Sequence, residues 1–460
     1  MNDPTSIATA WMDQAWDDDA GLLWNPPGAF SDVAEPRSVH LVRETGWYAI
    51  GLLRRSGPGD HQRAERALRA VLGHQYDAPG EPWHGTFVRF PEWPAPKPGA
   101  VEWVDYDPNW RQFVGTALAV AMTDFTLSPA LVEQGRSSIA LAVTAEPPDR
   151  VPPTYANIAL LRAWLEAWNG SADTTYAEEV AAAFRRHGCF AEHNSPTYYG
   201  IDLLALGLWQ RPDARADLRR LGEEIETALW TDVARWWHAG LGNLCGPYSR
   251  AYGMDLRTYV SGLGLALWCA DLPAPLPALT TDRIPHGHDL CVAPLLEHGR
   301  VRVPAPARAA FERFPGPHAV HQIVDDHPAR VATGWLDDDV MLGAESHAHG
   351  AQARGQYHPA TVHWRLPSGD IGWLRLEHHG PTRATASERR LEVDCQPHAR
   401  RGPQPLHWDS NVEPAQVAVE HWRFPGLEVA VATNAGPLDV VTMTQTPAPS
   451  GITRVTLTIR

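Results

Sequence analysis

The fold can be worked out from residues 192–209, which read EHNSPTYYGIDLLALGLW. The second half has the apolar period of a buried helix, with Ile201, Leu204 and Leu208 on one stripe. The first half is polar, and Ser195 followed by Pro196 is typical of a helix start. Four side chains gather at this start and can bind an anionic group or transfer a proton: His193, Asn194, Tyr198 and Tyr199. A capping Asn with supporting aromatic rings is the purely structural interpretation.

The same form recurs along the N-terminal part of the chain. YGIDL at 199–203 returns as YGMDL at 252–256, 252 − 199 = 53 residues later, and each is followed by an apolar run that closes on Leu-Trp. Looser versions open apolar segments after Glu44, Asn109 and Tyr155. The starts lie roughly 40 to 65 residues apart, which predicts a repeated helical architecture.

Apolar and amphipathic helices alternate over residues 1–275. The apolar ones are expected at 43–54, 107–123, 153–168, 196–209 and 253–269, and the amphipathic ones at 5–20, 61–76, 129–145, 172–187 and 212–238. Two strand-like runs predict a hairpin insertion near 86–104. We therefore predict an (α/α) toroid, in which the inner-helix starts converge on one cleft: Glu44, Asn109, Tyr155, Asn194 and Tyr248. A right-handed solenoid of helix pairs is the alternative, and it does not converge these loops.

The pattern changes in the C-terminal part. Residues 276–317 are Pro-rich and predict an irregular linker. Residues 318–460 show a period of two, with strands expected at 329–342, 360–366, 371–377, 391–395, 416–424, 427–432, 438–443 and 452–459. The turn PSGD at 367–370 predicts a hairpin. The fold class is therefore an α+β multidomain chain, with an antiparallel β-sandwich after the helical domain.

Composition limits the function classes. The chain of 460 residues is 44% hydrophobic, holds 20 Trp, and has a net charge of −15 from 39 basic and 54 acidic residues. The negative charge argues against nucleic acid as a partner, while aromatic side chains suit carbohydrate surfaces as well as cores. The five cysteines form no CxxC pair, which indicates reduced thiols.

No targeting segment is recognised. The N-terminus lacks a basic region followed by an apolar core, and no apolar run reaches the length of a membrane span. The expected location is the cytoplasm, with no membrane partner, and the sequence does not indicate an oligomeric state.

A helical toroid followed by an antiparallel β domain resembles the heparinase II/III-like and alginate-lyase-like polysaccharide lyases. Those lyases place an Asn-His pair at the start of one inner helix and a Tyr on a following inner element. The pair is reversed here, as His193-Asn194, and Tyr248 follows 54 residues after Asn194. A His of the β domain commonly completes the site, and the resemblance implies His358 for that role.

The resemblance implies β-elimination on a uronic acid, a reaction that needs no metal or cofactor. Asn194, protonated His193 or Arg250 would hold the uronate carboxylate, because the C5 proton becomes acidic once that charge is neutralised. Tyr248 or a His would take the proton, and Tyr would donate one to the leaving oxygen. The expected substrate-binding residues at the loop ends are Glu44, Trp47, Asn109, Trp110, Tyr198, Tyr199 and Tyr252.

Two other functions stay open. A glycoside hydrolase on the same scaffold would use a carboxylate pair drawn from Glu44, Asp105, Asp107 and Asp202. A non-catalytic carbohydrate-binding protein would use the aromatic faces alone.

Three groups of histidines lack strong ligand spacing, so no metal is predicted. They are His286 and His288 with Asp289, His347 with His349, and His378 with His379.

Overall fold

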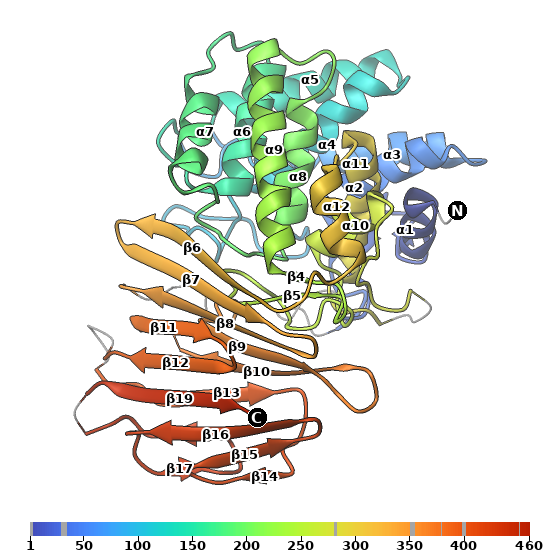
Figure 1. The fold of residues 1–460 in the computed structure, drawn as a ribbon. Helices are drawn as coiled ribbons and strands as arrows, with labels where there is room; N and C mark the ends of the chain where they lie inside the picture. The colour runs from blue at the N-terminus through green and yellow to red at the C-terminus, as the bar shows by residue number, and fades with distance from the viewer. Residues whose placement is uncertain are drawn as a thin grey trace. The chain divides into compact units, whose positions relative to one another are not determined.

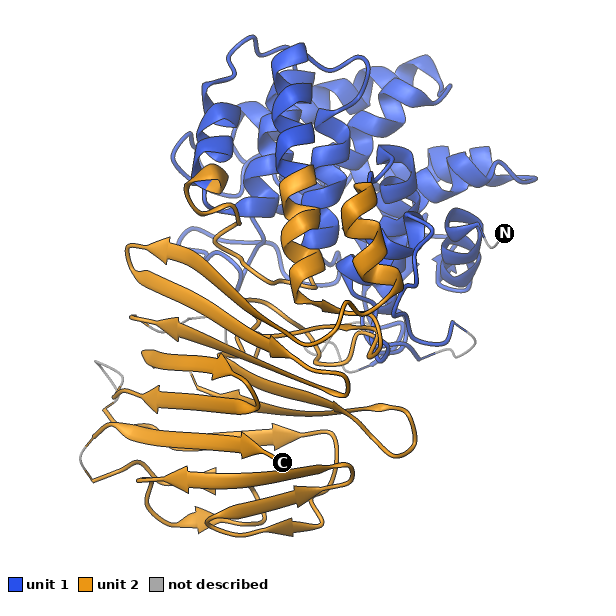
Figure 2. Cartoon of the chain, viewed as in Figure 1, with its two compact units in different colours: residues 1–183, 198–226, 257–302 blue, residues 184–197, 227–256, 303–460 orange. Residues whose placement is uncertain are grey.

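The computed structural model describes residues 3–28, 35–279, 283–349, 355–378, 380–397, 402–449 and 451–460, so His379 lies outside the described residues. The chain combines helices and antiparallel sheet (Figure 1), as the predicted α+β class requires. It divides into two compact units that share the sequence in alternating pieces (Figure 2). Unit 1 holds residues 1–183, 198–226 and 257–302, and unit 2 holds residues 184–197, 227–256 and 303–460.

The helices of unit 1 follow the predicted alternation closely. They are α1 (Pro4–Asp13), α2 (Val42–Arg55), α3 (Asp60–Leu72), α4 (Trp110–Asp124), α5 (Pro129–Thr144), α6 (Ala156–Trp168), α8 (Tyr199–Trp209), α10 (Gly262–Cys269) and α11 (Ala293–Gly299). Two more, α7 (Thr175–His187) and α9 (Ala216–Trp236), begin in unit 1 and end in unit 2. Three short strands, β1 (Trp16–Asp17), β2 (Leu22–Trp24) and β3 (His40–Leu41), form a small sheet before α2.

The apolar helices pack against one another in a closed series. Helix α2 contacts α4, α4 contacts α6, α6 contacts α8, α8 contacts α11, and α11 contacts α2. Every residue of α8 is buried. Glycines let α8 approach its neighbours, because a Cβ on Gly200 would lie 2.3 Å from the Gly262 carbonyl oxygen and one on Gly207 would lie 2.6 Å from that of Gly299. Helix α8 is therefore enclosed on all sides within its unit.

Several local predictions for this part of the chain are wrong. The helix expected at 5–20 ends at Asp13, and the helix expected at 196–209 begins at Tyr199 without a side-chain cap from Ser195. Residues 86–104 form a loop, because the two expected strands do not pair with each other: Phe87 makes an isolated bridge to Gln75, and Glu102 makes one to Tyr106. The last apolar helix begins at Gly262 rather than 253, since Ser261 caps it by accepting a hydrogen bond from Gly264 N at 3.0 Å. The expected linker 276–317 contains the 3₁₀ helix η1 (Gly287–Val292), α11 and α12 (Ala305–Glu312).

The sheet of unit 2 is one antiparallel array of fourteen strands in the described residues. The strands are β6 (His318–Asp326), β7 (Ala329–Leu336), β8 (Val340–His347), β9 (Ala360–Arg365), β10 (Ile371–Glu377), β11 (Thr382–Ser387), β12 (Arg390–Cys395), β13 (Leu406–Ser410), β14 (Gln416–Val417), β15 (His421–Phe424), β16 (Leu427–Thr433), β17 (Leu438–Asp439), β18 (Thr444–Gln445) and β19 (Thr453–Ile459). A separate pair, β4 (Trp237–His238) and β5 (Asn243–Leu244), belongs to the same unit.

This curled sheet differs from the predicted sandwich of two separate sheets. Strand β8 pairs with β9 along Val340–Ala344 and with β11 at His347, so it joins the two halves into one ladder. The inner faces of both halves share one apolar core, which includes Leu342, Trp408 and Leu457. The period-two pattern is thus confirmed, while the continuity through β8 is not visible in the sequence.

None of the described helices has the length and apolar character needed to cross a bilayer.

Candidate functional site

The five predicted catalytic residues come together in unit 2 from three segments of the chain. Tyr248 and His358 pair as a short antiparallel bridge, with Tyr248 N donating to His358 O at 3.1 Å and His358 N donating to Tyr248 O at 2.9 Å. Ser249 N donates to His193 O at 3.3 Å, which brings the first segment to the second. Main-chain hydrogen bonds therefore fix the three segments to one another before any side chain is considered.

Asn194 supports the turn that carries Tyr248. Its backbone has a φ of 54°, in the left-handed region, and its side chain is buried. The amide nitrogen donates to Cys245 O at 2.6 Å and to Pro247 O at 2.7 Å. An amide has two donor hydrogens, so both are engaged by main-chain oxygens. Asn194 accordingly positions the 245–247 turn, and its amide hydrogens do not face a substrate carboxylate.

His193 is held by an acidic partner that sequence reasoning missed. Its Nε2 lies 3.2 Å from Asp232 Oδ2, and both side chains are buried. The edge of the imidazole packs on Trp236, with ring centroids 5.4 Å apart. A carboxylate against one nitrogen fixes the orientation of an imidazole, which is the arrangement of a general base. Asp232 lies on α9, where the sequence shows only a charged outer helix.

Tyr248 has a buried hydroxyl beside a second histidine. The hydroxyl donates to Leu244 O and lies 3.5 Å from His363 Nε2. His363 Nε2 lies 3.0 Å from Met254 O, and burial lowers the pKa of His363 to about 4. His363 is therefore neutral at pH 7. Neither His363 nor its proximity to Tyr248 is signalled by the sequence.

Arg250 is the most solvent-accessible of the five, with 29% of its side chain exposed. Its Nε donates to Gln356 Oε1 at 2.7 Å and its Nη1 donates to Glu192 Oε1 at 3.3 Å. Burial raises the pKa of Glu192, although Arg250 and Arg330 oppose that shift. The guanidinium is thus oriented by an amide and a carboxyl, which were not predicted although they flank His358 and His193 in the sequence.

His358 lies next to another arginine. Its Nε2 is 3.4 Å from Arg375 Nη1, and Arg375 donates to Asp409 Oδ2 at 2.7 Å and to Glu377 Oε1 at 3.0 Å. The site of unit 2 therefore combines a His–Asp pair, a tyrosine beside His363, and two oriented guanidinium groups with His358 next to one of them.

The predicted substrate-binding residues divide between the units. Tyr252 is in unit 2 and is 37% exposed. The other six are in unit 1: Glu44, Trp47, Asn109, Trp110, Tyr198 and Tyr199. Tyr199 opens α8 and is buried at 1% exposure.

At the start of α2, Arg43 covers the predicted tryptophans. Its guanidinium carbon lies 4.5 Å from the ring centroid of Trp47 and 5.2 Å from those of Trp110 and Phe113. Both tryptophans are 2% exposed, so they form a cation–π support rather than an open platform. Arg43 also donates to Glu44 Oε1, while Glu44 Oε2 has no hydrogen-bond partner among the described residues.

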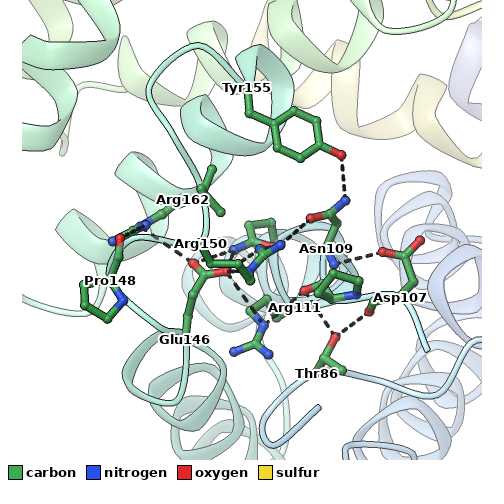
Figure 3. Close-up of polar contacts among 12 residues, drawn as sticks. Thr86, Asp107, Asn109, Arg111, Glu146, Pro148, Arg150, Tyr155 and Arg162 are labelled. Atoms are coloured by element: carbon green, nitrogen blue, oxygen red, sulfur yellow. Dashed lines mark hydrogen bonds and ion pairs between the residues drawn. The ribbon is translucent and has the colours of Figure 1, made fainter. Parts of the chain in front are cut away.

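Asn109 belongs to a buried polar network between α4, α5 and α6 (Figure 3). Its Nδ2 donates to Tyr155 Oη at 2.9 Å, and Arg150 Nη1 donates to its Oδ1 at 2.9 Å. Arg150 Nε in turn donates to Glu146 Oε1 at 2.8 Å. Asn109 and Tyr155, two of the five residues expected at one cleft, thus contact each other, and their amide and phenol are hydrogen-bonded together.

Carboxylates of the hydrolase alternative have different surroundings. Burial raises the pKa of Asp107, and Arg43, Arg89 and Arg150 oppose the shift. Asp105 is exposed and accepts a hydrogen bond from Val101 N at 2.8 Å, whereas Asp202 is buried in α8.

The side chains of His286, His288 and Asp289, for which the sequence predicts no metal, lie close together. One donor atom from each of His286, His288 and Asp289 lies within 4.8 Å of the others. Asp289 stands between the imidazoles, 3.8 Å from His286 Nδ1 and 3.4 Å from His288 Nε2. Burial raises the pKa of Asp289 to about 7 and lowers that of His286 to about 4.

Comparison with known families gives two matches. Residues 5–298 match the model of a family described as Domain of unknown function (DUF8769), and residues 312–446 match one described as Domain of unknown function (DUF8770). No curated protein matches the chain.

Proposed function

Because the chain belongs to the family described as Domain of unknown function (DUF8769), its chemistry has to be inferred from its own side chains, and we propose that it is a carbohydrate-active lyase. It would cleave uronic-acid-containing oligo- or polysaccharides by β-elimination. The observation that carries the proposal is the meeting of His193, Tyr248, Arg250 and His358 from three distant segments of unit 2.

The proposal includes the architecture of unit 1 as an (α/α) toroid. The closed series of contacts through α2, α4, α6, α8 and α11 supports a ring of inner helices. A solenoid would leave the first and last helices without mutual contact, whereas α11 contacts α2. The combination of such a ring with an antiparallel sheet is the basis of the resemblance to heparinase II/III-like and alginate-lyase-like enzymes.

In the proposed reaction, Arg250 holds the uronate carboxylate. It takes this role in place of Asn194, because both amide hydrogens of Asn194 bind main-chain oxygens. Charge neutralisation by a guanidinium makes the C5 proton acidic and stabilises the enolate-like intermediate. Gln356 and Glu192 orient that guanidinium, so the position of the carboxylate is defined before substrate arrives.

The C5 proton then moves to the imidazole of His193, because the hydroxyl of Tyr248 already carries its hydrogen, which it donates to Leu244 O. Removal of the C5 proton leaves an electron pair that forms the C4–C5 double bond as the C4–O bond breaks. The departing oxygen takes the hydroxyl hydrogen of Tyr248, which gives up its bond to Leu244 O and lies beside His363 Nε2. Asp232 stabilises the imidazolium that forms on His193.

The test compares wild type with Tyr248→Phe on a panel of oligosaccharides. The ultraviolet absorbance of an unsaturated product measures the rate on each. Tyr176→Phe is a matched control, because Tyr176 Oη also donates to a main-chain oxygen, that of Val151, and lies in unit 1. Tyr248→Phe should lower turnover ~10²–10⁴-fold with substrate binding little changed, while Tyr176→Phe stays active. Equal activities of the two variants would remove Tyr248 from the site, and a saturated product with water added would remove the lyase proposal.

A glycoside hydrolase is the second candidate, favoured by two observations in unit 1. Asp107 has a raised pKa, as a general acid requires, and Glu44 keeps one carboxylate oxygen without a partner among the described residues. This candidate predicts that Glu44→Gln or Asp107→Asn abolishes turnover while Tyr248→Phe is tolerated. A non-catalytic carbohydrate-binding protein would bind members of the same panel and release no product of either kind.

A further inference from the structure

We infer that His286, His288 and Asp289 bind a divalent metal ion of the zinc class in unit 1. The three side chains lie in one short segment, His286-Gly287-His288-Asp289, at the start of η1. They offer two imidazole nitrogens and one carboxylate oxygen, a donor set that zinc and related first-row ions accept. This site is independent of the β-elimination proposed for unit 2.

The spacing of the donor atoms matches a coordination sphere. On a tetrahedral ion with bonds of about 2.0–2.1 Å, neighbouring donors lie about 3.3–3.4 Å apart. His288 Nε2 lies 3.4 Å from Asp289 Oδ1, and His286 Nδ1 lies 3.8 Å from Asp289 Oδ2. Small shifts of these side chains are therefore enough to bind a metal ion.

The backbone of the segment is held in place by its packing. His286 has a φ of 55°, and Asp289 N donates to His286 O at 2.9 Å, which closes a turn. This turn brings the side chains of His286 and Asp289 close together. A Cβ on Gly287 would lie 2.6 Å from Cη2 of Trp11, so glycine is required between the histidines. The two imidazole centroids are 5.6 Å apart. The donor set is thus preorganised by contacts that do not involve a metal.

The local charge favours a cation. Arg43 Nη2 lies 3.8 Å from Asp289 Oδ1 and also binds Glu44 Oε1. With both carboxylates ionised, Glu44, Asp289 and Arg43 sum to −1, so one positive charge of a divalent ion is balanced locally. Three protein ligands also leave a coordination position for water or for an oxygen of a bound molecule, as in catalytic zinc sites.

The experiment measures metal binding by the full-length protein directly. Protein stripped with a chelator is titrated with Co²⁺, whose visible d–d bands report bound metal, and Zn²⁺ is then added in competition. Wild type should bind one equivalent of Co²⁺ that Zn²⁺ displaces. His286→Ala, His288→Gln and Asp289→Asn should each weaken binding at least ~10-fold, because the loss even of an outer-shell partner costs that much.

Two controls separate this site from other ligands. His74→Gln removes a histidine of unit 1 whose Nδ1 lies 2.7 Å from Ala70 O, and it should bind Co²⁺ like wild type. The spectrum should lack thiolate-to-cobalt charge-transfer bands, because Cys291 is not among the three donors. Stripped wild type that binds no Co²⁺, or binding that survives all three replacements, would overturn the inference. Circular dichroism identifies any variant that fails to fold, and the folded replacements decide the question.

Discussion

Asn194 combines an unusual backbone conformation with two hydrogen bonds from one side chain. Its φ of 54° is tolerated by Asn better than by most residues, and its amide fixes the carbonyls of Cys245 and Pro247. Both features serve the position of Tyr248, which follows that turn directly. The residue therefore contributes to stability whatever the reaction is.

We expect Asn194→Ala to be less stable than Asn194→Gly by about 1 kcal/mol, because alanine has a steric cost in the left-handed region that glycine lacks. Both should be less stable than wild type by ~1–3 kcal/mol, since two buried carbonyls lose their donor. Urea unfolding followed by circular dichroism measures the difference. Asn434 is exposed and outside the positive-φ residues, so glycine there should be no better than alanine. An Ala variant at 194 as stable as the Gly variant would contradict the conformational argument.

The sequence predicts the segments that form the site, but not the side chains that contact them. His193, Asn194, Tyr248 and His358 were predicted together, and hydrogen bonds place them together. Asp232, His363 and Arg375 were missed, because long-range pairing in a sheet and on a mixed helix leaves no local pattern. The sequence also gives no sign that the Asn194 amide binds main-chain oxygens instead of substrate, because the two carbonyls that accept its hydrogens are more than 50 residues away.

At the scale of elements, an acidic residue at the end of α4 connects three parts of unit 1. Asp124 is the last residue of α4, and its carboxylate accepts hydrogen bonds at 2.6 Å from Arg211, just after α8, and from His298 in α11. Burial by itself raises the pKa of Asp124, but the hydrogen bonds from His298 and Arg211 outweigh it and lower the pKa to about 2.

This shift has a defined sign in the pH dependence of stability. A carboxyl whose folded pKa is about 2 and whose ordinary value is 3.8 stabilises the fold fully above about pH 4, and the contribution is lost as pH falls towards 2. Asp124→Asn should therefore unfold at lower urea than wild type at pH 7. The difference should shrink as pH falls from about 4 towards 2.

The control is Glu133→Gln, which changes an exposed acid of α5 and should leave the urea midpoint within error at every pH. A gap between wild type and Asp124→Asn that stays constant down to pH 2 would show that ionisation of Asp124 does not stabilise these contacts.

Helices were predicted better than connections. The bounds of α2, α4, α6 and α8 follow from an apolar period that tertiary packing reinforces. The hairpin near 86–104 was wrong because its two apolar runs bridge to Gln75 and Tyr106 rather than to each other, and Phe87 and Phe90 are buried from a loop instead. The predicted start of α10 at residue 253 was wrong. YGMDL at 252–256 resembles the helical YGIDL, but the helix begins only after its cap at Ser261. Asn243 binds that stretch through Met254 O and Leu256 N, which are not helical.

At the scale of the molecule, the chain crosses between the two units five times. Unit 2 needs residues 184–197 and 227–256 in addition to the sheet. Trp236 packs closely on β7, since a Cβ on Gly334 would lie 2.7 Å from its ring. The bridge between Tyr248 and His358 joins another inserted segment to the sheet. The expected boundary near residue 318 therefore does not coincide with the division between the compact units.

We expect the fragment 303–460 to be poorly soluble and to bind a hydrophobic dye, because it lacks Trp236, Tyr248 and the rest of both inserted segments. Near-ultraviolet circular dichroism and dye fluorescence measure this against the full chain. A monomeric fragment with fixed tertiary packing would show that the inserted segments are dispensable.

The five crossings also set a schedule for synthesis on the ribosome. The last piece of unit 1 ends at residue 302, so that unit can close as soon as this piece leaves the exit tunnel. Segments 184–197 and 227–256 must wait until the sheet between 303 and 460 has been translated. At 5–20 residues per second this delay is on the order of ten seconds or more. During that interval we expect Trp236, Trp237 and Tyr248 to lack the sheet that covers them in the folded unit, so slower translation through the sheet should lengthen their exposure.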